Sequence, residues 1–239
     1  MSERTDCHIH PTAVIGADVL IGAGVTIGPN AVLTGPLEIG DDCWIGSGAV
    51  LGAPPEILGA LHPTSWSVSA GLGIRIGART TIRELSTVHQ GSERRTEIGE
   101  DCFVMNRVGI EHDVQIGDRC VVSSGTTLAG HVSVGDGVNL GMHTVAHQRR
   151  VVGSGSMIGM GTVVVKDVPP FSKAFGNPVS LHGVNRVGMS RSAGIAEEDI
   201  AAIEAVYAAG SFGTSPAIPD SLSEAFTWWR ERADKPLVV

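Results

Sequence analysis

The sequence predicts a mainly β protein, a parallel β-helix of hexapeptide repeats, and two regularities lead to this prediction. Large apolar residues recur at intervals of six in runs that begin at Ile15, Ile76 and Ile98. Glycine directly follows most of these anchors, and a small or β-branched residue commonly stands four places after them. A fixed short period is typical of a solenoid, whose units stack on their neighbours. Three hexads per coil would bring residues about eighteen positions apart above one another.

Each position of the hexad has its own expected environment. The anchor, at position one, points into the prism, and glycine at position two suits a corner where a Cβ would crowd. Position five suits a narrow interior beside the strands. It holds Val19, Val25, Ala31, Cys43, Ala49, Cys102, Val108, Val114, Cys120, Thr126, Val132 and Val138. Three of the four cysteines belong to this set, so we expect them to fill the core rather than form a disulfide or a metal site. Arg150 falls at the same interior position, which indicates either a distorted strand or a misleading repeat.

Two interruptions of the repeat predict loops. The first covers about residues 53–75, a stretch with proline and tryptophan and without the six-residue period. The second covers about residues 91–97, because the anchors Val88 and Ile98 are ten residues apart instead of six. Loops that project from a rigid scaffold often carry binding groups. Both are therefore candidate parts of a site.

The repeat ends after Val164, which divides the chain into a predicted β-helix domain, residues 1–178, and a C-terminal helical region, residues 179–239. Pro169 and Pro170 break the pattern. An apolar stripe predicts a helix over residues 196–209, ended by Gly210. A capping-box pattern at residues 221–224 predicts a second helix that continues through Trp229.

Composition and charge exclude several classes of protein. The 239 residues are 42% hydrophobic but only 4% aromatic, as expected for a core of valine, isoleucine and alanine. A net charge of −8 argues against nonspecific nucleic-acid binding as the main role. No apolar stretch is long enough for a membrane span, and the N-terminal residues lack the features of a signal peptide. A cytoplasmic location is expected.

Histidines provide the candidate chemistry, because the repeat would gather several of them at one edge. Counting by coils places Ile110, Leu128 and Ala146 on the same face, and Val88 joins them if the extra residues after it form a looped-out corner. A histidine follows each of them within three residues: His89, His112, His131 and His147. Glu111 and Asp113 flank His112, and a carboxylate held on one ring nitrogen would leave the other as a general base near neutral pH. The alternative is that these are solvated or hydrogen-bonded corner residues.

Longer motifs carry a resemblance to a known family. They are 10–13 (HPTA), 82–84 (IRE), 87–89 (TVH), 110–113 (IEHD), 127–134 (TLAGHVSV), 147–148 (HQ), 167–170 (DVPP) and 183–185 (GVN). With these motifs the chain resembles the UDP-N-acetylglucosamine O-acyltransferases that begin lipid A synthesis. Generic hexapeptide proteins share the repeat but not these motifs.

The resemblance implies a left-handed parallel β-helix, assembled as a homotrimer with active sites between neighbouring prisms. His112 matches the family's general base, which takes a proton from a sugar hydroxyl as it attacks the thioester of an acyl chain on acyl carrier protein. Asp113 accompanies it, and the backbone N–H of Gly130 matches the donor to the oxyanion. The implied acceptor is a UDP-N-acetylglucosamine-like nucleotide sugar. No cofactor and no metal ion are expected.

Further positions match substrate contacts of the family. They are His89, His131, His147 and Gln148, together with Asn185 and Arg191 at the nucleotide end. Met160 stands where glycine would let a long acyl chain pass, so a shorter acyl group is expected; the alternative is a methionine that only fills a gap. A local basic patch for the acidic carrier protein is also expected, from Arg94, Arg95, Arg149, Arg150 and Arg191.

Departures from the family pattern leave the substrate open. Gly109 replaces a second histidine, residues 54–59 replace a segment with aspartate and lysine, Val187 replaces a glutamate and Ser192 an arginine. A different nucleotide sugar or an acyl coenzyme A donor therefore remains an alternative. So does a zinc enzyme of the γ-carbonic anhydrase type, although Gly117 stands where its next histidine ligand would be. A trimeric nucleotide-sugar-binding protein without catalysis is the third alternative.

Overall fold

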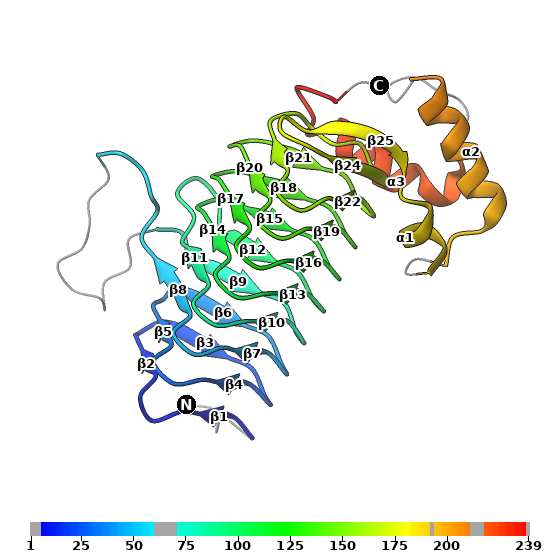
Figure 1. Cartoon of the computed structure of the whole chain (residues 1–239). Helices are drawn as coiled ribbons and strands as arrows, with labels where there is room; N and C mark the ends of the chain where they lie inside the picture. Colours follow the sequence, from blue (N-terminus) through cyan, green and yellow to red (C-terminus); the bar gives the residue numbers. More distant parts are fainter. Residues whose placement is uncertain (1–5, 60–70, 192–193, 211–217, 238–239) are drawn as a thin grey trace.

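Short strands wind into a prism with three sheets along its faces (Figure 1). The computed structural model describes residues 6–59, 71–191, 194–210 and 218–237. We name the sheets I, II and III; they contain ten, eight and seven strands. Within the prism the neighbouring strands of every sheet are parallel, so the predicted parallel β-helix is confirmed.

From β1 to β23, consecutive strands along the chain belong to different sheets, so each full coil contributes one strand to each face. Sheet I contains β1 (His8–Ile9), β4 (Thr26–Ile27), β7 (Trp44–Ile45), β10 (Thr81–Ile82), β13 (Phe103–Val104), β16 (Val121–Val122), β19 (Asn139–Leu140), β22 (Met157–Ile158), β24 (Ser172–Phe175) and β25 (Ser180–Val184). Sheet II contains β2 (Val14–Ile15), β5 (Val32–Leu33), β8 (Val50–Ala53), β11 (Thr87–His89), β14 (Gly109–Ile110), β17 (Thr127–Leu128), β20 (Val145–Ala146) and β23 (Val163–Val164). Sheet III contains β3 (Val19–Ile21), β6 (Leu37–Ile39), β9 (Ile74–Ile76), β12 (Thr96–Ile98), β15 (Gln115–Ile116), β18 (Ser133–Val134) and β21 (Val151–Val152).

The hexad positions have the environments that the sequence predicts. All twelve residues named for position five are buried, and the thiols of Cys43, Cys102 and Cys120 donate hydrogen bonds to backbone carbonyls of adjacent coils. Glycine at position two is needed for close stacking: a Cβ on Gly40 would lie 2.6 Å from the backbone nitrogen of Ala78 in the next coil. At this corner the two coils can approach each other closely because position 40 has no side chain.

Sheet II has the register that the predicted grouping of histidines at one edge requires. Val88 pairs with Ile110, Ile110 with Leu128, and Leu128 with Ala146. The predicted common face of these four anchors is confirmed. The first predicted loop begins after β8 and ends at β9, and the second lies between β11 and β12. Residues 60–70 of the first loop lie outside the described residues.

The structure explains how an arginine, Arg150, can occupy an interior position of the repeat. Its side chain is only 3% exposed and points inward, as the repeat dictates, so neither a distorted strand nor a misleading repeat is found. Two carboxylates neutralise it: Asp167 at 2.8 Å and Asp234 at 3.0 Å. A buried guanidinium is tolerated because it is paired and hydrogen-bonded.

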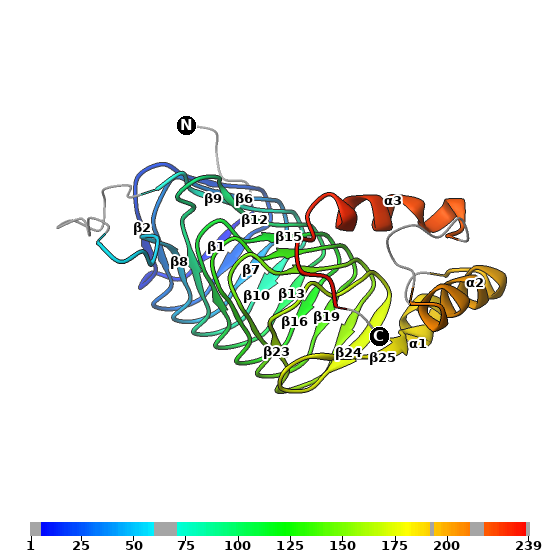
Figure 2. The same cartoon turned by 90° about the horizontal axis from the view of Figure 1, so that it is seen from above.

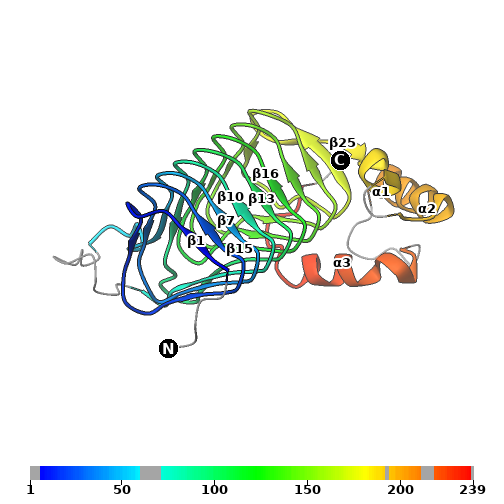
Figure 3. The ribbon, with the colours of Figure 1, turned by 90° about the horizontal axis from the view of Figure 1, so that it is seen from below.

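The C-terminal region begins with an antiparallel hairpin of β24 and β25 and continues with helices α1 (Arg186–Arg191), α2 (Glu197–Ala208) and α3 (Asp220–Arg230). Figures 2 and 3 show these helices beside the C-terminal end of the prism. They form a second hydrophobic core, which includes Phe226 and Trp229 and reaches the prism through Val151 and Phe171. No described helix has the length and apolar character needed to cross a membrane.

Two details of the helices differ from the prediction. Helix α1 was not expected, because six residues are too few for a periodic signal. The capping box at residues 221–224 does not form: α3 starts one residue earlier, at Asp220, and has no side-chain cap. The hydroxyl of Ser221 instead donates a 2.6 Å hydrogen bond to Asp199 of α2. A contact between helices has therefore replaced the local cap.

Candidate active site

His112 and Asp113 lie at the corner between sheets II and III, directly after β14. The Nδ1 atom of His112 is 2.7 Å from Oδ2 of Asp113. The histidine side chain is 14% exposed, whereas the aspartate side chain is fully buried. Asp113 has a positive φ of 64°, a conformation that aspartate adopts more readily than most residues. The turn itself therefore directs the carboxylate toward the preceding histidine.

The loop between β11 and β12 encloses the carboxylate of Asp113. Its oxygen Oδ1 accepts backbone N–H groups from Ser92 at 2.9 Å, Glu93 at 2.8 Å and Arg94 at 2.7 Å. Its oxygen Oδ2 accepts the hydroxyl of Ser92 at 2.6 Å. Successive N–H groups of this kind form an anion-binding concavity. The inserted residues therefore hold the carboxylate in place.

The ionisation of Asp113 follows from these contacts. Burial alone would raise its pKa, but the hydrogen bonds from Ser92, Arg94, His112 and Glu93 outweigh burial and hold the pKa well below its usual value. An ionised carboxylate only accepts hydrogen bonds, so Nδ1 of His112 carries a proton and donates it. Nε2 then has the lone pair when the ring is neutral. Within the described part of the chain, Nε2 has no hydrogen-bond partner.

Gly130 lies directly beneath the His112 ring, one coil further along. A Cβ at position 130 would be 2.7 Å from Nε2 of His112 and 2.6 Å from Cε1. Only glycine leaves room for the ring in this position. Among the described residues, no acceptor pairs with the N–H of Gly130. A basic nitrogen and an available backbone donor are thus close neighbours.

His131 completes the cluster from the coil of Gly130. Its ring meets the His112 ring edge to face, with centroids 5.1 Å apart, and its Nε2 is 3.7 Å from Oδ2 of Asp113. Burial lowers the pKa of His131, although the nearby Asp113 opposes this effect. A neutral His131 beside the base is the expected state near neutral pH.

Glu111 and His89 form a neighbouring group on the sheet II side of the corner. Nδ1 of His89 is 2.7 Å from the carbonyl oxygen of Pro54, and its Nε2 is 3.6 Å from Oε2 of Glu111. Burial raises the pKa of Glu111, the charge of His89 lowers it, and the carboxylate of Glu56 raises it further; the result is a raised pKa. His89 is 7% exposed, so access to a substrate is narrow.

Comparison with known proteins begins with family profiles. The bacterial transferase hexapeptide repeat matches residues 5–35 and 95–130, and the hexapeptide repeat of succinyl-transferase matches residues 36–54. Domain 2 of UDP-N-acetylglucosamine O-acyltransferase matches residues 167–211. The last match lies in the hairpin and the first two helices, outside the generic repeat.

Two curated relatives decide the family. The acyl-(acyl-carrier-protein)–UDP-N-acetylglucosamine O-acyltransferase of Sulfurihydrogenibium sp. is 48% identical over 237 residues, which cover 90% of this chain and 84% of the relative. The enzyme of the same name from Thermodesulfovibrio yellowstonii is 36% identical over 203 residues, covering 83% of this chain and 75% of the relative. The chain belongs to the UDP-N-acetylglucosamine O-acyltransferase family. It is an O-acyltransferase, as the sequence predicts.

Solved structures of this O-acyltransferase family share the fold. The UDP-N-acetylglucosamine acyltransferase of Bacteroides fragilis superimposes with a TM-score of 0.75 at 26% identity, over 100% of both chains. That of Campylobacter jejuni gives a TM-score of 0.71 at 25% identity, over 98% of both chains. The prism is therefore the left-handed parallel β-helix that the resemblance implies.

His147 and Gln148 of this O-acyltransferase stand at the same corner as His112, two coils further along. His147 occupies the coil position of Glu111, and Gln148 that of His112, because Ile110 pairs with Leu128 and Leu128 with Ala146. Both side chains are exposed. The structure thus brings His89, His112, His131, His147 and Gln148 to one edge of the prism, and their substrate contacts remain predictions.

Met160, Asn185 and Arg191 lie elsewhere on the same chain. Met160 is 71% exposed at the corner between sheets I and II. Asn185 and Arg191 line a cleft of about 970 Å³ between the corner of sheets III and I and the helices α1 and α3. None of the histidines at the His112 corner lines this cleft. In one chain, therefore, these three residues are separate from the candidate base.

Asn185 also has a structural task in this O-acyltransferase. Its Nδ2 donates to the carbonyl of Gly155 at 2.9 Å, and its Oδ1 accepts the N–H of Gly188 at 3.2 Å. The second contact caps the first turn of α1. Its predicted role at the nucleotide end must therefore coexist with this capping role.

The space at Gly109 shows how one departure from the family pattern is accommodated. A Cβ there would meet no atom closer than 3.6 Å, and its nearest neighbours are Thr127 and the carboxylate of Glu111. These are ordinary van der Waals contacts, so a Cβ is tolerated at this position. Of the other departures, Ser192 lies outside the described residues.

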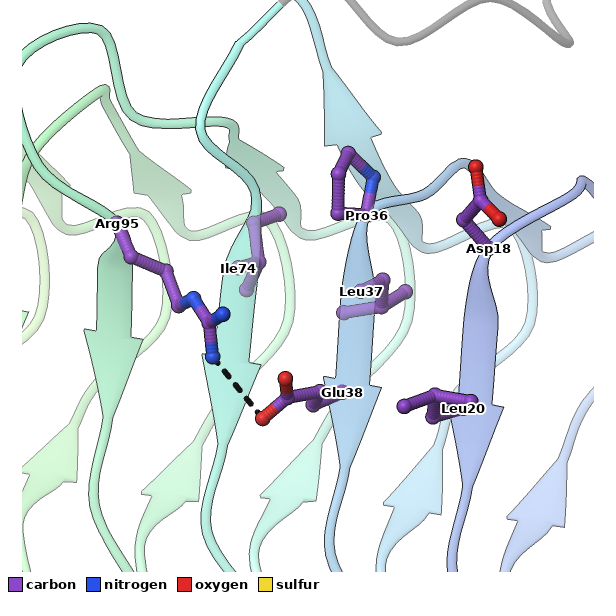
Figure 4. A pocket seen from close by; sticks show the side chains of 7 residues that line it. All are labelled: Asp18, Leu20, Pro36, Leu37, Glu38, Ile74 and Arg95. Carbon is purple, nitrogen blue, oxygen red and sulfur yellow. Dashed lines mark ion pairs between the residues drawn. The ribbon is translucent and has the colours of Figure 1, made fainter.

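The predicted basic patch is wrong for two of its arginines. Arg150 is buried in an ion pair, and Arg95 pairs with Glu38 at 3.0 Å. Figure 4 shows this second pair at a pocket of about 200 Å³ on the outer side of sheet III. The pocket is lined by residues in and beside β3, β6 and β9 and by Arg95, and none of the predicted catalytic or substrate-binding residues lines it. The net positive charge available near His112 is correspondingly smaller.

Sequence reasoning named Arg94 for the basic patch but missed the contacts that Ser92, Glu93 and Arg94 make with Asp113. Their backbone N–H groups and the hydroxyl of Ser92 donate hydrogen bonds to Asp113. Almost any residue type can supply a backbone N–H, so the sequence does not reveal such a donor. The only available signal was the length of the insertion, which predicted a loop but not its target. An inserted loop next to a histidine-bearing coil is the feature that would have found them.

Proposed function

We propose that this O-acyltransferase moves an acyl chain from acyl carrier protein to a hydroxyl of a UDP-N-acetylglucosamine-like nucleotide sugar, with His112 as general base. One observation carries the proposal: Nε2 of His112 has no hydrogen-bond partner among the described residues and lies beside Gly130, while Asp113 holds Nδ1. Base and oxyanion donor are the two elements that acyl transfer to a hydroxyl requires. The names of the relatives supply the donor and the acceptor.

The proposed reaction proceeds in two steps. Nε2 of His112 takes the proton of the sugar hydroxyl as its oxygen attacks the thioester carbonyl carbon. The tetrahedral oxyanion accepts a hydrogen bond from the N–H of Gly130, which supports the developing charge by about 3 kcal/mol. Collapse expels the thiolate of the carrier protein, which takes up the proton from the imidazolium. The ionised Asp113 stabilises that imidazolium between the two steps.

The remaining predicted residues fit a site that is shared between copies of the chain. His89, His131, His147 and Gln148 would contact the acyl and sugar groups, while Met160, Asn185 and Arg191 would come from other surfaces. Because those three lie away from the His112 corner in one chain, a homotrimer with sites between prisms is part of the proposal. Met160 at such an interface would limit the length of the acyl chain.

Replacement of His112 by alanine tests the base. With acyl carrier protein thioesters and UDP-N-acetylglucosamine, we expect kcat to fall by about 10²- to 10⁴-fold, the range typical of general base catalysis. The melting temperature should stay unchanged because the ring lies at a corner. Light scattering of the variant should give the same mass as the parent. A variant with parental kcat would overturn the assignment.

The acceptor needs a separate test, because residues 54–59 and Gly109 depart from the family. A panel of UDP-sugars that differ at the acyl-accepting carbon, assayed with one acyl carrier protein thioester, should rank UDP-N-acetylglucosamine first in kcat/KM. Preference for another sugar would change the proposed acceptor and leave the assignment of His112 as general base unaffected. A parallel assay with acyl coenzyme A separates the two donors.

A further inference from the structure

Glu56, His89 and Glu111 form a cluster beside the proposed base, and the proposed acyl transfer gives no role to its two glutamates. Each contributes one potential ligand atom, and these atoms all lie within 4.8 Å of one another. Glu56 belongs to the loop after β8, His89 ends β11, and Glu111 directly follows β14. Three consecutive coil levels of sheet II thus converge on one point.

The orientation of His89 suits a metal ligand. The carbonyl of Pro54 can only accept a hydrogen bond, so Nδ1 of His89, at 2.7 Å, carries the ring proton. When the ring is neutral, the lone pair of Nε2 faces Oε2 of Glu111 at 3.6 Å. Two facing lone pairs repel unless a proton or a metal cation lies between them, and a divalent metal ion would satisfy both atoms at once. Metal-bound histidines typically donate their other N–H to a carbonyl in this manner.

One carboxylate oxygen of Glu111 lacks a hydrogen-bond donor among the described residues. Its Oε2 atom is closed to solvent and, within the described part of the chain, accepts no hydrogen bond. An unpaired buried carboxylate oxygen costs several kcal/mol, so such atoms normally have a partner. The oxygens of Asp113 differ: they already accept the loop N–H groups, Ser92 and His112. The neighbouring group of His112, Asp113 and His131 therefore has less capacity for an ion.

Distance and charge select the class of ion. In a tetrahedral site with bonds of about 2.0–2.1 Å, neighbouring ligand atoms are about 3.3 Å apart. The observed 3.6 Å between Nε2 and Oε2 needs only a small closure to reach this value. Two carboxylates balance the charge of one divalent cation, and a mixed nitrogen and oxygen donor set favours zinc and its neighbours over magnesium.

We propose that Glu56, His89 and Glu111 bind one divalent transition-metal ion of the zinc class per chain. The ion ties the loop after β8 to the prism beside the base. With three protein ligands, a fourth position stays open to water or to an oxygen of a bound substrate. The site is distinct from the proposed base and oxyanion donor.

Zinc binding by the full-length protein tests the proposal. Chelator-treated protein is titrated with ZnCl2 by calorimetry, and Co²⁺ reports the coordination geometry through its visible absorption. We expect one ion per chain, with Kd raised at least tenfold in Glu111→Gln and in His89→Ala. His131→Ala is the matched control from the neighbouring cluster and should bind as the parent does. Circular dichroism checks that each variant is folded.

The outcomes separate this proposal from the proposed function. His112→Ala should lose turnover but retain one zinc ion, because the readout does not involve acyl transfer. Absence of stoichiometric zinc binding by the parent overturns the site. So does unchanged affinity in folded Glu111→Gln, or loss of the ion in His131→Ala, which would place it at the other cluster.

Discussion

Two corners of the same prism use carboxylates in different ways. At the corner between sheets III and I, Asp41, Asp118 and Asp136 each accept one backbone N–H from the preceding coil, at 2.8, 2.8 and 3.0 Å. These side chains are exposed; that of Asp136 is 55% accessible. At the corner between sheets II and III, the buried Asp113 accepts three N–H groups from an inserted loop.

The difference teaches how a repeat acquires chemistry. In the regular repeat the aspartate side chains face solvent, and each links two coils through one hydrogen bond. These aspartates therefore all have the same structural role. The insertion after β11 shields Asp113 from solvent, and its backbone N–H groups donate hydrogen bonds to Oδ1. The other oxygen, Oδ2, orients His112. A few extra residues thus convert a stacking contact into support for a base. Four changes test this comparison, from the largest expected effect to the smallest.

Asp113→Asn should have the largest effect. The amide retains the shape and tolerates the positive φ, but it removes the charge that fixes the tautomer of His112. We expect kcat to fall by about 10³-fold. Steady-state kinetics measure this, and crystallography of the variant checks that the loop keeps its place. Parental kcat would contradict the orienting role.

Gly130→Ala should follow. The new methyl group would meet the His112 ring at 2.6 Å, so the ring must move away from the acceptor oxygen. We expect a loss of about 10²-fold in kcat with little change in melting temperature. Gly109→Ala is the matched control, because its Cβ meets only ordinary contacts at 3.6 Å or more. Equal losses in both variants would contradict the packing argument.

Ser92→Ala should have an intermediate effect. It removes the 2.6 Å hydrogen bond to Oδ2 but leaves the three backbone donors to Oδ1. The lost bond to a charged group should lower the free energy of unfolding by about 1.5–3 kcal/mol. A fall of several-fold in kcat should accompany it. Chemical denaturation and steady-state kinetics of the same preparation provide both values.

Asp118→Asn should have the smallest effect. Its side chain is 44% exposed and its single accepted N–H can be replaced by water. We expect a change of less than about 1 kcal/mol in the free energy of unfolding and parental kcat. A destabilisation as large as that of Asp113→Asn would show that the two corners are equivalent after all.

The fold was predictable because its cause is periodic. Anchors and position-five residues repeat in the sequence, so the register of Val88, Ile110, Leu128 and Ala146 followed by counting. The same counting placed the histidines at one edge. Arg150 shows the limit, because the period gave its inward direction but not its partners, which come from residues far along the chain.

The candidate site was only partly predictable. Residue types indicated His112 and its neighbours, but the N–H groups of Ser92, Glu93 and Arg94 carry no side-chain signature. The cluster of Glu56, His89 and Glu111 depends on where a long loop returns to the prism, which spacing does not specify. Interactions between inserted segments and the repeat can therefore be identified only from a three-dimensional structure.

The buried pair of Arg150 and Asp167 has a consequence for association between molecules. Asp167 forms a parallel bridge with Pro236 and accepts the N–H groups of Asp234 and Lys235. Residues 234–237 thereby cover backbone groups at the last coil of sheet III, where an open strand edge would invite another chain to add on. With residues 234–237 paired there, fewer backbone groups at this end of the prism are available to an added strand.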